Sequence, residues 1–173
     1  IGDGAQLSDA QNLRISYART LARPEYRELS PIKSRDVLNG DNLEGNPNLQ
    51  RTRIQNADVR WEWYPASGEA VTIGVFAKQF DDPIERVYRA GGASSRFVAF
   101  VNAEEATNYG VELDLRKNLG FLSEAFVPFS LFSNVTLMES SIDLGSAQSA
   151  ATNTERRMVG QAPYVLNVGL AYA

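Results

Sequence analysis

Apolar and polar residues alternate along six stretches of the chain, and this period of two predicts β-strands rather than helices. The pattern is clearest at 109–116, where Tyr, Val, Leu and Leu alternate with Gly, Glu, Asp and Arg. Such strands belong to a sheet that has one apolar and one polar face. The six predicted strands cover about 13–23, 53–64, 71–81, 107–116, 129–137 and 164–172.

The second and third strands form a hairpin with an aromatic end. Pro65 fixes one backbone angle of the turn and Gly68 permits the unusual one, as a tight reversal requires. Trp61 and Trp63 share the apolar face with Val59, whereas the intervening residues are charged. Reading the other turns in the same way predicts an all-β, antiparallel up-and-down meander.

The predicted connections alternate between long and short. Long irregular segments follow the first, third and fifth strands, at about 24–50, 82–107 and 139–162. Shorter ones follow the second and fourth strands, at 65–69 and 117–128. Outer-membrane barrels have this asymmetry, with long extracellular loops and short periplasmic turns. A soluble β-sandwich has no reason to keep its long loops at one end, although its strands also alternate.

Aromatic residues, strand length and charge placement also favour a barrel. The predicted strands run for about nine to eleven residues, the span of a tilted membrane strand. The charged strand residues fall on the polar face, where they avoid lipid. Aromatic side chains are favoured at the headgroup level of a membrane. The predicted interfacial aromatics are Trp61, Trp63, Tyr64, Phe126, Phe129 and Tyr164.

Composition narrows the function further. The 173 residues include neither cysteine nor histidine, and the net charge is -4. The chain therefore lacks the usual general base and the thiol nucleophile of enzymes, and its sequence contains no other catalytic motif in their place. An acidic chain without a basic run is not expected to bind nucleic acid. We therefore expect no enzymatic activity, catalytic residue, cofactor or metal site.

The ends and hydropathy of the chain fit a piece of a larger membrane protein. No window offers the roughly 18 apolar residues of a membrane-spanning helix, which leaves strands as the crossing elements. Residues 1–4 lack the charged and apolar regions of an export signal. The chain is therefore expected to begin within a longer protein or after processing.

Five short motifs together resemble the C-terminal part of the barrel of TonB-dependent outer-membrane receptors. The resemblance covers 13–172, and the order and spacing of the motifs carry it rather than any single one. The motifs are SYARTLARP at 16–24, GNPNL at 45–49, FDDPIE at 80–85, TNYGVEL at 107–113 and GQAPYVLN at 160–167.

The resemblance implies a cell outer-membrane location and a plugged barrel of the 22-stranded transporter class. Residues 1–173 would then be a curved open section of about six strands, with the plug and the remaining strands absent. The implied partners are membrane lipid, the rest of the same barrel with its plug, and the TonB complex through that missing plug. The implied ligand is scarce, such as a ferric siderophore, cobalamin or a glycan.

Charged and aromatic residues of the three long segments are the candidate ligand contacts, because binding residues concentrate on loops held by a rigid scaffold. Two alternatives to energised uptake stay open: a passive porin or adhesin-like barrel, and a soluble β-sandwich binding module. The sequence does not identify the ligand. The candidate contacts are Arg27, Arg35, Asp36, Asp41, Arg86, Tyr88, Arg89, Arg156 and Arg157.

Overall fold

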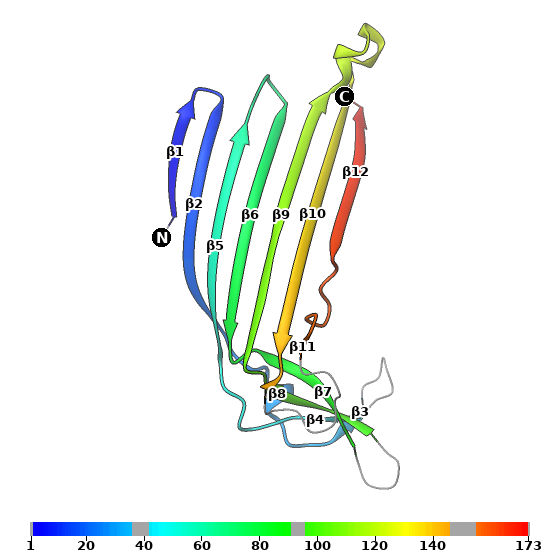
Figure 1. Ribbon diagram of the computed structural model, residues 1–173. Coiled ribbons are helices and arrows are strands. Elements are labelled where there is room, and N and C mark those ends of the chain that lie inside the picture. Colours follow the sequence, from blue (N-terminus) through cyan, green and yellow to red (C-terminus); the bar gives the residue numbers. More distant parts are fainter. Residues whose placement is uncertain (1, 36–41, 91–95, 146–154, 173) are drawn as a thin grey trace.

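The protein is built around one tall sheet that remains open at both edges (Figure 1). The computed structural model describes residues 2–35, 42–90, 96–145 and 155–172. The long strands are β2 (Gln11–Ala22), β5 (Thr52–Trp63), β6 (Ala70–Asp81), β9 (Glu105–Asn118), β10 (Phe129–Asp143) and β12 (Tyr164–Tyr172). A shorter strand, β1 (Gly2–Ser8), forms the edge beside β2. The predicted antiparallel meander is confirmed.

The register of the sheet places every second residue of neighbouring strands on one face. Val59 lies opposite Ile15 on one side and Val75 on the other, and Val75 lies opposite Val111. The intervening positions form the second face, where Arg60 lies between Arg14 and Gly74. We call the face that bears Val59 the outer face, and the face that bears Arg60 the inner face.

The outer face of this sheet exposes large apolar side chains. Val59, Val75 and Val111 are 44%, 53% and 45% exposed, although each lies in the middle of a strand. A soluble protein rarely leaves so continuous an apolar surface uncovered. An apolar face of this kind is typical of the lipid-facing side of a barrel.

A second, smaller sheet lies at the end of the tall sheet opposite the short turns (Figure 1). Its strands are β3 (Ser34–Arg35), β4 (Asn42–Glu44), β8 (Arg96–Asn102) and β7 (Ile84–Ala90), and β4 runs parallel to β8. We call this sheet and the helix α1 (Tyr26–Leu29) the cap. Within the described ranges no helix has the length and apolar character needed to cross a bilayer.

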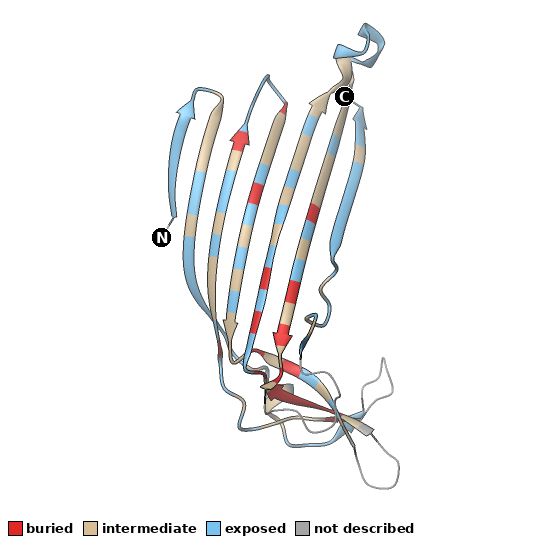
Figure 2. Cartoon of the chain, viewed as in Figure 1, coloured by how far each residue is buried: buried red, intermediate tan, exposed pale blue. Residues whose placement is uncertain are grey.

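The buried apolar residues lie at the cap end, where Figure 2 shows β8 and the end of β10 in red. One cluster joins Leu43, Val98 and Phe100 between strands of the cap. The other joins residues of the cap junction with the end of β10, where Ile142 is completely buried. The hydrophobic core thus lies in the cap and at its junction with the tall sheet, whereas the rest of the tall sheet has none among the residues described.

Two of the predicted irregular segments are wrong, because they contain the strands of the cap. Residues 97–101 form a continuous apolar run, and Val98, Ala99, Phe100 and Val101 are all buried. A strand covered on both faces loses the alternation of period two. The first segment likewise contains α1, β3 and β4.

Three further boundaries also differ from the prediction. Residues 2–8 form β1 through backbone pairing with β2 and bury no side chain, so their sequence has no apolar pattern. Strand β10 continues to Asp143, and a two-residue strand, β11 (Glu155–Arg156), pairs with its end. The predicted connection 117–128 contains the short 3-10 helices η1 (Leu119–Phe121) and η2 (Glu124–Phe126).

Gly45 of the GNPNL motif permits a close approach of two backbone segments in the cap. A Cβ at Gly45 would collide with the backbone carbonyl of Ser30 and would lie 2.7 Å from that of Glu28. The neighbouring Asn46 donates its backbone N–H to the Glu28 carbonyl at 2.6 Å, and its side-chain amide to the Phe100 carbonyl at 3.2 Å. The motif therefore joins α1 to β8.

Candidate functional site

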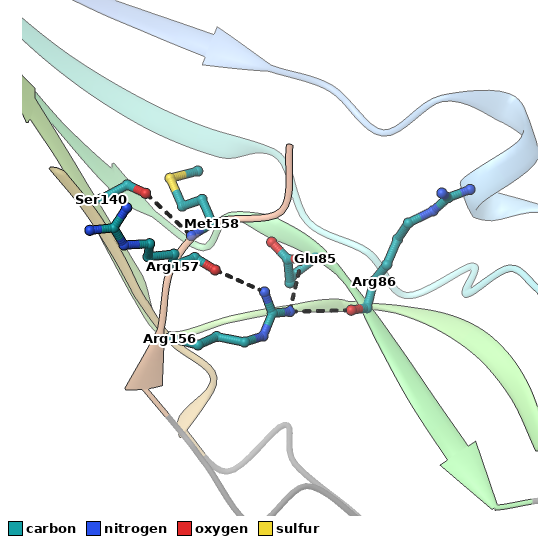
Figure 3. Close-up of polar contacts among 6 residues, drawn as sticks. All are labelled: Glu85, Arg86, Ser140, Arg156, Arg157 and Met158. Carbon is teal, nitrogen blue, oxygen red and sulfur yellow. Dashed lines mark hydrogen bonds and ion pairs between the residues drawn. The ribbon is translucent and has the colours of Figure 1, made fainter. Parts of the chain in front are cut away.

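The predicted second and third long segments meet at a buried ion pair (Figure 3). Arg156 donates from Nη2 to Oε1 of Glu85 at 3.0 Å, and the Glu85 side chain is only 8% exposed. Arg156 also donates to the backbone carbonyls of Arg86 and Arg157. A buried carboxylate needs such a partner, because leaving it unpaired costs several kcal/mol, about 3–5. Arg156 therefore fastens its segment to β7.

Residues 155–161, which we call the strap, lie beside the end of β10 that is next to the cap. Arg157 pairs with Glu139 of β10 at 3.3 Å, and the Met158 backbone N–H donates to Ser140 Oγ at 3.4 Å. Met158 also packs against the buried cluster at the cap junction. The strap thus connects the tall sheet to β7 through both charge and apolar contact.

Strand β7 presents its candidate residues on two faces. Arg86 and Tyr88 are exposed, and the Arg86 guanidinium lies 5.6 Å from the ring centre of Phe100. Alternate residues of a strand lie about 7 Å apart on the same side, so these two side chains are neighbours. Arg89 takes the opposite face, and its Nε is buried without a hydrogen-bond partner in the described part of the chain. Arg86 and Tyr88 therefore lie on the exposed side of β7, and their role as ligand contacts stays a prediction.

Two of the remaining candidates lie on other elements of the cap. Arg27 is exposed on α1, and Arg35 is exposed on β3 opposite Asn42. Asp36 and Asp41 lie outside the described residues. The structure therefore brings together candidates from the second and third long segments through Glu85, which the sequence did not single out.

Charged side chains form cross-strand pairs on the inner face. Arg14 lies 3.2 Å from Glu62, and Arg60 lies 3.7 Å from Glu112. Near the short turns, Lys117 pairs with the largely buried Glu69 at 2.7 Å. The inner face is therefore polar but largely neutralised. Within the described residues, no group of three or more acidic side chains has the arrangement of a metal site.

Most of the predicted interfacial aromatics gather near the short turns. Trp61 and Trp63 are both on the outer face, and their rings are stacked with centres 6.3 Å apart. Phe129 lies between Phe126 and Tyr172, with ring centres 6.0 and 5.2 Å away. Tyr64 directly follows β5, and its hydroxyl donates to Glu62.

Tyr164 is in a different place from the other predicted aromatics. It is the first residue of β12 and lies opposite Leu137, well inside β10, and Glu139 follows on the same face of β10.

Two further tyrosines, Tyr17 and Tyr109, were not among the predicted interfacial aromatics, although they also lie just before the outer face becomes polar. The sequence feature that could have identified them is the change from aromatic to polar on the same face. Arg19 stands two residues after Tyr17, and Thr107 stands two residues before Tyr109. The membrane depth of these aromatics stays a prediction.

Sequence comparison assigns the chain to a family. The family described as "TonB dependent receptor-like, beta-barrel" matches residues 5–173. The chain belongs to this family. The resemblance predicted from the five motifs is thus confirmed, and the family is one of transport receptors rather than enzymes. A comparison with curated proteins gives no match.

Solved receptors of this family share the fold. The siderophore receptor PirA from Pseudomonas aeruginosa aligns over 84% of this chain and 30% of its own, with 19% identity and a TM-score of 0.64. A mutant of the ferric enterobactin receptor PfeA from Pseudomonas aeruginosa, in complex with enterobactin, aligns over 99% and 25%, with 19% identity and a TM-score of 0.67.

A third similar structure is a double mutant of the Serratia marcescens hemophore receptor HasR, in complex with its hemophore HasA and heme. It aligns over 80% of this chain and 21% of its own, with 16% identity and a TM-score of 0.63. The chain therefore spans less than a third of the length of these receptors. At these identities the likeness concerns the fold.

Proposed function

We propose that this chain forms part of the barrel of an outer-membrane receptor that imports a scarce ligand with energy supplied through TonB. The ligand class that the similar structures favour is a ferric siderophore or heme; cobalamin and glycans are the other candidates. The remaining strands and a plug would complete the barrel. The plug would occupy the side of the inner face and would carry the contact with the TonB complex.

One observation supports this proposal most strongly: a cap with its own buried cluster lies at one end of a tall sheet whose outer face exposes large apolar side chains. An apolar outer face and a polar inner face are the two sides of a membrane barrel wall. Arg86 and Tyr88 lie on β7 of the cap, outside the apolar outer face, which supports the proposal that a ligand arriving from water contacts them.

The soluble β-sandwich alternative does not fit this architecture. A sandwich covers the apolar face of each sheet with another sheet. Among the described residues, no second sheet lies on the outer face, and its valines and leucines remain exposed. The passive porin or adhesin-like alternative is an outcome of the test below.

Growth of the host organism tests energised uptake. A strain lacking the gene of the intact receptor is grown in iron-limited medium with ferric enterobactin or heme as the iron source, and is complemented with the wild-type gene. We expect growth to return with one of these sources and to disappear when TonB is also deleted. Ligand-dependent growth that survives TonB deletion would favour a passive barrel. No effect with either source would reject ferric enterobactin and heme as the ligand.

Cap variants test the ligand contact. We expect Arg86→Ala combined with Tyr88→Ala to weaken binding of the active iron source about tenfold or more, as truncation of central Arg and Tyr contacts does. Arg116→Ala is the matched control, because Arg116 is an exposed arginine of β9 near the short turns. Equal binding by both variants would show that Arg86 and Tyr88 do not contact the ligand.

A further inference from the structure

The outer face changes from apolar to polar along a sharp line. Four successive cross-strand rows of β2, β5, β6 and β9 are largely apolar, and the fourth consists of Tyr17, Ala57, Ala77 and Tyr109. The next row toward the cap is Arg19, Gln55, Gln79 and Thr107. An amphiphilic molecule lying on this face would therefore have its polar group at the level of Arg19.

A shallow hollow of about 330 Å³ lies at this line. Tyr17 and Tyr109 form its two sides, and the small side chains of Ala57 and Ala77 form its floor between them. Gln55 and Gln79 line its polar end. The row below carries the larger valines Val59 and Val75, so the floor is recessed only at this level.

Arg19 stands at the polar end of one side of the hollow. Its Nε donates to the Tyr17 hydroxyl at 2.9 Å, and its guanidinium carbon lies 5.9 Å from the centre of the Tyr17 ring. The Tyr17 hydroxyl in turn donates to Gln55 Oε1 at 2.9 Å. These contacts hold the guanidinium in place while its two terminal nitrogens bond to none of the described residues.

Arg19 differs in its charged neighbours from two arginines of the inner face. Arg14 and Arg60 each pair with a glutamate, whereas no carboxylate of the described residues pairs with Arg19. In the next row toward the cap, Arg53 of β5 lies directly opposite Asp81 of β6, and Glu105 of β9 follows. The cationic part of the line is therefore Arg19 on β2.

We propose that the hollow binds one hydrocarbon chain of an anionic, phosphate-bearing membrane lipid, whose phosphate is bound by Arg19. The chain would lie on Ala57 and Ala77 between the two tyrosine rings, and the headgroup would lie beside Gln55. A guanidinium that is already oriented loses little freedom when it binds a phosphate. The inference rests on the proposed membrane location.

Spin-labelled lipids provide the test. The intact receptor is reconstituted in phosphatidylcholine vesicles containing either spin-labelled phosphatidylglycerol or spin-labelled phosphatidylcholine, and the motionally restricted fraction is measured for each. We expect a preference for phosphatidylglycerol of about 1.5- to fivefold, the range for one solvent-accessible charge pair. The preference should disappear in 1 M salt, where the Debye length falls to about 3 Å.

Three variants decide the outcome. Arg19→Gln should abolish the preference, whereas Arg60→Gln, which removes the same charge from the inner face, should retain it. Ala77→Leu should fill the hollow and reduce the restricted fraction of both lipids. A preference that survives in Arg19→Gln would overturn the inference, even if Ala77→Leu does not fold.

Vesicle flotation separates this inference from the proposed function. A wild-type receptor that does not float with the vesicles would contradict the membrane location, and with it both proposals. A receptor that floats but binds both labelled lipids equally would contradict only the lipid site.

Discussion

At the scale of single residues, buried Glu85 has the contact with the clearest consequence. Its partner Arg156 is 30% exposed, so the pair is partly shielded from water. We expect Glu85→Gln to weaken the attachment of the strap by about 1–2 kcal/mol, because a hydrogen bond to a neutral acceptor contributes less than one to a carboxylate. Hydrogen exchange of the backbone amides at 155–158 should then become roughly 5–30 times faster.

The control for this prediction is Glu139→Gln. Glu139 pairs with Arg157 of the same strap, but its side chain is 57% exposed. Such a surface pair contributes about 0–1 kcal/mol, so exchange at 155–158 should change little. Equal effects of the two variants would show that Arg156 and Glu85 do not fasten the strap.

Two glycines on the inner face have opposite surroundings. A Cβ at Gly110 would lie 2.7 Å from Cζ of Phe76 and would collide with the Leu137 carbonyl, whereas the nearest atom to a Cβ at Gly74 is 3.7 Å away. Overpacking of this kind costs about 1–3 kcal/mol. Gly110→Ala should therefore lower the unfolding temperature of the intact receptor in detergent, and Gly74→Ala should not. The reverse order would contradict this packing of Phe76.

At the scale of elements, β8 determines the stability of the cap. It lies between β4 and β7, and its Phe100 is only 4% exposed. Phe100→Ala should destabilise the cap by about 3–5 kcal/mol, since it removes a large side chain from a core. Faster hydrogen exchange in β4 and β7, with the tall sheet unchanged, is the expected measurement.

Phe132 provides the matched control for Phe100. It lies on the tall sheet, is 47% exposed and has its ring against Gly169. Phe132→Ala should leave exchange in β4 and β7 at the wild-type rate. Unchanged exchange in Phe100→Ala would mean that the cap does not depend on its own core.

At the scale of the whole molecule, the orientation of the tall sheet can be tested with two adjacent residues. Asp58 lies on the inner face and Val59 on the outer face. Nitroxide labels are attached to Asp58→Cys and Val59→Cys in the intact receptor in vesicles, and their collision rates with oxygen and with a water-soluble nickel chelate are measured. The label at 59 should favour oxygen, which concentrates in hydrocarbon. The label at 58 should show the lower ratio of oxygen to nickel collisions.

The ratio of the two collision rates at each site serves as its internal control. A higher oxygen preference at 58 than at 59 would place the charged face toward lipid. Such a result would reject the barrel orientation, because a charged side chain facing the bilayer midplane costs about 2–4 kcal/mol.

The sequence alone determined the tall sheet, because each of its faces meets one kind of surroundings and the residues alternate accordingly. Val59, Val75 and Val111 appear in the pattern as they do in the structure. The same alternation assigned Arg60 and Glu62 to the opposite face, and the five motifs identified the family. The side chains of β1 are all exposed, so its sequence has no alternation of apolar and polar residues, and the sequence did not predict this strand.

Only the tertiary structure decided the cap and the site. Residues 98–101 are apolar and buried on both faces of β8, and an apolar run without a period of two does not specify a strand. Arg156 and Glu85 are 71 residues apart in the sequence, so their pairing depends on how the fold places the strap beside β7. The line between Tyr17 and Arg19 likewise became visible only when the register aligned four strands. Local alternation reports what each face touches, whereas contacts between distant segments depend on the folded path of the chain.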